Sequence, residues 1–157
     1  MSRDFARLAG GTLFMVAVLS FVPTLSFSDG PDHQAHSTTL PPGVMDAVWE
    51  WTWFGSGAEQ FDVENPDKYT VQFFDDGSLA IQADCNRGRG EYTIDPEGQI
   101  TLTLLAMTMM LCEGDSRSDQ FLQGLEQARL FFEMDGDFFL EAPIDSGTLR
   151  FRRAMGG

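Results

Sequence analysis

Histidine is nearly absent from this chain of 157 residues. Its two copies, His33 and His36, lie close together near the N-terminus, and no histidine follows them. General-base catalysis by imidazole, and the Ser-His-Asp and Cys-His arrangements that depend on it, are therefore excluded from the rest of the chain. A metal site at His33 and His36 with Asp32 is disfavoured, because a metal ion needs three or four ligands on a rigid framework.

Basic residues are also scarce. The 10 Lys and Arg stand against 24 Asp and Glu, which gives a net charge of −14. Such a surface repels nucleic acid phosphates and anionic lipid headgroups, so neither is an expected partner. A cationic protein would be attracted, although the same charge also favours solubility.

Long apolar runs are missing except for residues 13–22, which are too few for a membrane span of about 20 residues. Arg3 and Arg7 precede this run, and small residues follow it up to Ser28. The pattern predicts a secretory signal peptide, residues 1–28. An uncleaved anchor is the alternative. No cysteine lies near the cleavage zone, so a lipid-anchored form is not expected.

Cysteine occurs twice, as Cys85 and Cys112, and the spacing is not the Cys-x-x-Cys of thiol oxidoreductases. Behind an export signal, one even pair most often forms a disulfide. A redox sensor and two unpaired thiols are the alternatives. The pair and the signal together predict a periplasmic or secreted protein.

Short strand-like segments separated by turn residues follow a flexible linker at 29–43, and predict one antiparallel domain over 44–154. Residues 59–68 are expected to form a polar loop. One helix is predicted over 118–128, capped by Ser116 or Ser118. The predicted strands are 48–53, 69–74, 78–83, 90–95, 99–104, 130–134, 138–141 and 148–152.

Two acidic pairs, Asp75 with Asp76 and Asp135 with Asp137, could suggest catalytic carboxylates or calcium ligands. Each pair flanks a glycine between two predicted strands, and neither has the spacing of an EF-hand. Ordinary turn chemistry is the better interpretation.

Three tryptophans, Trp49, Trp51 and Trp53, alternate along the first strand and are expected to share one face. They either pack beneath the helix or mark a binding surface. Glu50, between them, should point the opposite way into solvent. The methionines at 107, 109 and 110 are interpreted as part of a buried strand, with an adaptable apolar groove as the alternative.

The two cysteine motifs and the elements around them resemble the META domain family, also called HslJ-like. The helix and a Phe-rich hairpin follow the second motif, as in that family, whereas Asp84 stands where many relatives have glycine. The residues that carry the resemblance are Cys85, Asn86, Gly90, Tyr92, Thr108, Met110 and Cys112.

The resemblance implies an α+β fold, an antiparallel sheet of about 7–8 strands curled into an open barrel with one short helix. It implies a bacterial cell-envelope protein linked to heat shock, stress response or antibiotic tolerance, and it suggests no enzymatic activity. We expect no cofactor and no metal. We therefore expect a non-enzymatic domain that binds an unknown hydrophobic or protein ligand. The alternative is a secreted acidic inhibitor, or a binding protein for a cationic enzyme.

Overall fold

The computed structural model of the protein describes residues 39–144 and 146–156. The predicted signal peptide, residues 1–28, and both histidines lie outside the described residues, as does most of the predicted linker at 29–43. Leu40, at the end of that linker, is 2% exposed and packs in the hydrophobic core. The packed part of the chain therefore includes residues before Val44.

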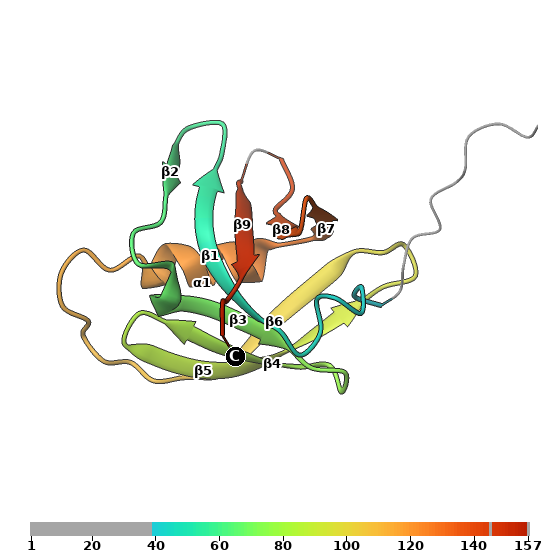
Figure 1. The fold of residues 1–157 in the computed structure, drawn as a ribbon, viewed down its shortest axis with the longest axis horizontal. Coiled ribbons are helices and arrows are strands. Elements are labelled where there is room, and N and C mark those ends of the chain that lie inside the picture. The colour runs from blue at the N-terminus through green and yellow to red at the C-terminus, as the bar shows by residue number, and fades with distance from the viewer. Residues whose placement is uncertain (1–38, 145, 157) are drawn as a thin grey trace, which may run out of the picture. The chain divides into compact units, whose positions relative to one another are not determined.

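The described chain forms an antiparallel sheet with one α-helix. The sheet has the strand order β6-β5-β4-β3-β1-β9-β8-β7, with β2 added beside β1 (Figure 1). The curled sheet and its helix confirm the predicted α+β fold. The elements are β1 (Val48–Gly55), β2 (Gln60–Asp62), the 3-10 turn η1 (Pro66–Lys68), β3 (Tyr69–Phe73), β4 (Ser78–Ala83), β5 (Asn86–Ile94), β6 (Ile100–Met107), α1 (Ser118–Gln127), β7 (Leu130–Met134), β8 (Asp137–Glu141) and β9 (Thr148–Arg153).

Helix α1 packs its apolar side into the sheet, as the helical spacing predicts. Phe121 and Leu125 are fully buried, and the Phe121 ring stacks on Trp51 with 5.3 Å between centroids. Gly124 costs the helix about 1 kcal/mol relative to alanine. A Cβ there would lie 2.8 Å from Cδ1 of Leu149, so glycine lets α1 approach β9 closely. Close packing against the sheet, more than local helix propensity, therefore fixes this helix.

The curled sheet is held at its open side by a backbone contact. The amide of Ile100 donates to the carbonyl of Arg129, at 2.9 Å, which brings the start of β6 next to the residue before β7. Within the part of the chain that the structure describes, no helix has both the length and the apolar character needed to cross a membrane.

The tryptophan stripe is only partly confirmed. Trp49 and Trp51 are 1% and 0% exposed, but Trp53 is half-buried on the outer face of the sheet. The pairing of β1 with β9 shifts register between Trp51 and Trp53, so a bulge turns the strand over. Phe54, at 7% exposure, takes the inward position instead. The prediction that all three tryptophans share one face is therefore wrong for Trp53.

Other local predictions also differ from the structure. The expected polar loop at 59–68 contains β2 and η1. The N-cap residue of helix α1 is Arg117, whose side chain makes no capping bond, and the Ser118 hydroxyl donates to the carbonyl of Ala83 at 3.0 Å. The Ser116 hydroxyl, the other predicted cap, accepts from the amide of Ser118 at 3.3 Å. Met109 is 94% exposed and Met110 58% exposed, so the interpretation of this run as a buried strand is wrong beyond Met107.

Candidate functional site

The cysteine motifs come together at one end of the β4–β5 hairpin. Cys85 lies in the turn between β4 and β5, and Cys112 lies in the segment that follows β6. The two residues form a disulfide with an S–S distance of 2.05 Å. The predicted pairing is therefore confirmed, and the alternative of two unpaired thiols is wrong.

Asn86 ties the same two segments together by hydrogen bonds. Its side-chain amide donates to the carbonyl of Met110 at 3.0 Å. Its side-chain oxygen accepts from the amide of Met110 at 2.7 Å and from the Thr108 hydroxyl at 3.0 Å. The Thr108 hydroxyl oxygen in turn accepts from the amide of Arg87 at 3.0 Å. Asn86 is only 8% exposed, so its polar atoms are satisfied by protein groups and not by bulk water.

Gly90 and Tyr92 shape the other part of β5. A Cβ on Gly90 would lie 2.4 Å from the carbonyl oxygen of Thr103, so no side chain fits beside the bulge at this point of the β5–β6 pair. The Tyr92 hydroxyl donates to the carbonyl of Phe74 at 2.8 Å. Burial raises the pKa of Tyr92, and nearby carboxylates, Asp75 first, add to the effect. Gly90 therefore allows β5 and β6 to approach closely, and Tyr92 ties β5 to the residue after β3.

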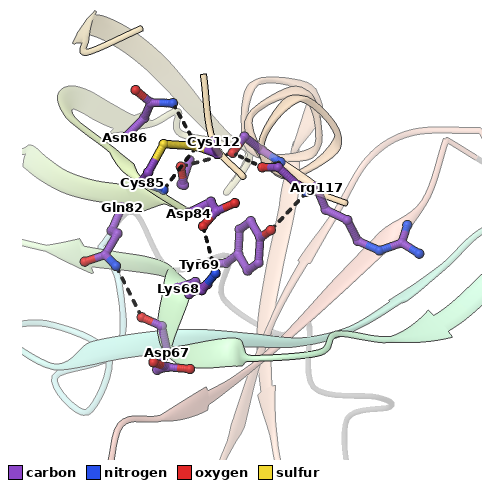
Figure 2. Close-up of polar contacts among 12 residues, drawn as sticks. Asp67, Lys68, Tyr69, Gln82, Asp84, Cys85, Asn86, Cys112 and Arg117 are labelled. Atoms are coloured by element: carbon purple, nitrogen blue, oxygen red, sulfur yellow. Dashed lines mark hydrogen bonds and ion pairs between the residues drawn. A yellow bond between two sulfur atoms is a disulfide. The ribbon is translucent and has the colours of Figure 1, made fainter. Parts of the chain in front are cut away.

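Asp84 reproduces the turn conformation that glycine would give. It is the first of the two turn residues before Asn86 and has a φ of 57°, in the left-handed region that favours glycine. Its side chain is 6% exposed and pairs with Nζ of Lys68 at 3.2 Å (Figure 2). The departure from the family pattern thus keeps the turn and adds an ion pair.

A polar cleft of about 390 Å³ lies beside this turn. Figure 2 labels four of its lining residues, which are Lys68, Tyr69, Asp84 and Arg117. Its acidic groups are Asp62, Glu64, Asp84, Glu113 and Asp115, and its basic groups are Lys68 and Arg117. The Tyr69 hydroxyl also lines the cleft, where it accepts a hydrogen bond from the amide of Arg117 at 2.9 Å. No cluster of three or more His, Cys, Asp or Glu suited to a metal ion occurs among residues 39–144 and 146–156.

Apolar side chains face solvent on β7, one of the two terminal strands in the sheet order. Leu130, Phe132 and Met134, here called the β7 stripe, are 49%, 39% and 55% exposed. Phe132 stacks in parallel on Phe139 of β8, with 4.8 Å between ring centroids. The stripe is a candidate docking surface, because large exposed apolar side chains grouped on an edge strand are unusual.

The sequence model described as "META domain" matches residues 43–155. The chain belongs to the META domain family. An NMR structure of a protein from Burkholderia xenovorans is 19% identical, with a TM-score of 0.57 over 80% of this chain and 99% of that chain. A DUF4847 family protein from Bacteroides vulgatus ATCC 8482 is 10% identical, with a TM-score of 0.54 over 73% and 96%. Identities this low show a shared fold alone, and no curated protein has significant sequence similarity to the chain.

In this META domain, most of the motif residues predicted from the sequence form one bracket, made of Cys85, Asn86, Thr108, Met110 and Cys112. Gly90 and Tyr92 lie further along β5. The bracket holds the segment after β6 against the β4–β5 turn. The β7 stripe carries no sequence signal of its own, because Leu-Phe-Phe-Glu-Met has no alternation of apolar and polar residues.

Proposed function

We propose that this META domain is a non-enzymatic, periplasmic or secreted binding domain that docks a protein partner in stress or antibiotic tolerance. The observation that carries the proposal is the β7 stripe, an uncovered apolar row on a terminal strand of the described sheet. An edge strand of this kind accepts an extended segment of another protein, with main-chain bonds for affinity and side-chain pockets for specificity.

The charge around the stripe indicates what kind of segment would fit. Glu133 lies within β7 and Asp135 directly after it, and the whole chain has a net charge of −14. We therefore propose an apolar segment flanked by basic residues. The alternative, an acidic inhibitor or binding protein for a cationic enzyme, would depend on charge more than on the stripe.

The location and the biological role rest on separate support. A disulfide is typical of oxidising compartments, and the predicted signal peptide also favours the periplasm or the cell exterior. The link to heat shock and antibiotic tolerance is proposed from the family alone.

The test is capture from envelope extract by the exported, disulfide-bonded protein, followed by mass spectrometry and direct binding of the purified partner. Phe132→Ser should lose the partner, whereas Leu111→Ser should retain it, because Leu111 is 99% exposed but lies outside the stripe. Equal capture by both variants would contradict docking at β7.

Salt separates the two proposals. At about 1 M salt the Debye length falls to about 3 Å, which suppresses binding that depends on charge. Capture that survives high salt supports the stripe, and capture that disappears with salt but survives Phe132→Ser supports the acidic inhibitor.

The absence of enzymatic activity is a proposal that Glu50 helps to test. Its side chain is half-buried on the face of β1 opposite Trp49 and Trp51. A carboxylate could serve as a general base if its pKa were raised. A panel of hydrolase and thiol-oxidoreductase substrates should give no turnover, and turnover that Glu50→Gln abolishes would overturn this part of the proposal.

A further inference from the structure

A small cleft opens on the outer face of the sheet around Trp53. It has a volume of about 260 Å³ and is lined by Trp53 and Gly55 of β1, Gln60 of β2, Glu141 of β8 and Thr148 of β9, among others. We call this the Trp53 cleft. It shares no residue with the β7 stripe, although Glu141 of the cleft is the cross-strand partner of Leu130, and four strands build it.

The bulge in β1 creates the cleft by turning Trp53 outward. Gly55 then lets the indole lie against the strand, because a Cβ on Gly55 would be 2.1 Å from Cη2 of Trp53. A large aromatic surface is thus left half-buried at a concave site. Concave sites with an aromatic wall and a few polar groups are the usual form of small-molecule sites.

The polar groups around this indole are free to bind a ligand. Within residues 39–144 and 146–156, the side chains of Gln60, Glu141 and Thr148 and the indole N–H of Trp53 make no hydrogen bond or ion pair. They supply a carboxylate, an amide, a hydroxyl and an N–H within one small cleft.

Arg150, by contrast, is already engaged. Its guanidinium lies 5.8 Å from the centroid of the Trp53 ring and pairs with Asp62 at 3.8 Å and with Asp137 at 3.9 Å. It also donates to the Thr52 hydroxyl at 3.4 Å. A second cation over the same indole would be repelled by this one.

The remaining ligand classes can be compared by the free-energy penalty that each would meet on binding in the cleft. An anion would meet the carboxylate of Glu141 and a protein of charge −14. A purely apolar ligand would strip water from Glu141, Gln60 and Thr148 without replacing their hydrogen bonds. A neutral ring with many hydroxyl groups and one C–H face avoids all three penalties, because it satisfies the polar groups and stacks on the indole.

We propose that the Trp53 cleft binds a neutral saccharide, with one sugar ring on the Trp53 indole and its hydroxyls bonded to Glu141, Gln60 and Thr148. The volume is slightly below the lower limit of about 300 Å³ for drug-sized sites, which suits one sugar unit of a longer glycan. This activity goes beyond partner docking at the β7 stripe and does not depend on it.

The test is a titration of the full exported protein, followed by two-dimensional NMR. The sugars are the trisaccharide of N-acetylglucosamine, maltotriose and cellotriose. At least one should shift the Trp53 indole and Thr148 amide signals, with weakening of about tenfold or more in Glu141→Ala. Trp53→Ala should abolish the shifts. Leu111→Ala is the control, since Leu111 is 99% exposed and lies outside both the cleft and the β7 stripe, and this variant should bind as wild type does.

Several outcomes would overturn the proposal. They are an absence of shifts with all three sugars, shifts that persist in both Trp53→Ala and Glu141→Ala, and competition by tetramethylammonium, which would indicate a cation site. If Trp53→Ala does not fold, Thr148→Val and Glu141→Ala keep the same readout. If Phe132→Ser loses the protein partner but still binds sugar, the saccharide site is independent of docking at β7.

Discussion

Removing the disulfide should destabilise the domain chiefly by raising the conformational entropy of the unfolded chain. The change is the double substitution Cys85→Ala and Cys112→Ala, which leaves no free thiol. The two cysteines are 27 residues apart, and the chain-entropy relation gives about 3.5 kcal/mol for a loop of that length. That is a large share of the 5–15 kcal/mol by which domains are typically stable.

The assay is urea unfolding followed by tryptophan fluorescence, together with a thermal melt. We expect the free energy of unfolding to fall by about 3.5 kcal/mol and the midpoint temperature to fall by about 10 to 15 °C. The urea m-value should rise, because an unbridged unfolded chain exposes more surface.

Asn86→Ala is the matched control, since it breaks hydrogen bonds between the same two segments. It removes three bonds of 2.7 to 3.0 Å in the folded protein, at about 1 kcal/mol each, and leaves the unfolded chain bridged. Its m-value should therefore stay at the wild-type value. A loss below about 1 kcal/mol in the cysteine-free protein, or an unchanged m-value, would refute the reasoning.

Three further results are expected. Acrylamide should quench one of the three tryptophans, and Trp53→Phe should remove that accessible fraction; quenching of all three would place the other two outside the core. Gly124→Ala should lower stability by about 1 to 3 kcal/mol in urea, because its Cβ would overlap Leu149, and a gain in stability would show that helix propensity dominates. The raised pKa of Tyr92 favours the protonated phenol in the folded state, so its contribution is present below its ordinary value of 10.0 and lost as pH rises further. Urea midpoints between neutral pH and strongly alkaline pH should show this loss in wild type, and an equally steep loss in Tyr92→Phe would assign it elsewhere.

Much of the fold follows from local chemistry in the sequence. Residues 78–83 and 130–134 are strands with the predicted bounds, because turn residues at each end fix where a strand begins and stops. The helix follows from the spacing of Phe121, Leu122 and Leu125. The disulfide follows from one even pair of cysteines behind an export signal.

The candidate sites depended on contacts that are remote in the sequence. The Asn86 side chain bonds to Met110, which is 24 residues away, and no local sequence pattern predicts such a contact. Trp53 follows the same alternation as Trp49 and Trp51, yet the register of β9 against β1 turns it outward.

The same distinction holds for the apolar surfaces. Leu130, Phe132 and Met134 are as apolar as core residues, and pairing with β8 decides that they face solvent while Phe131 packs inward. The sequence by itself determined most of the strands, the turns and the helix, because their formation depends on neighbours within a few residues. It determined the bridge because the chain holds a single pair of cysteines. Only the tertiary structure decided which apolar side chains are covered, because burial depends on which distant strand or helix lies across each face.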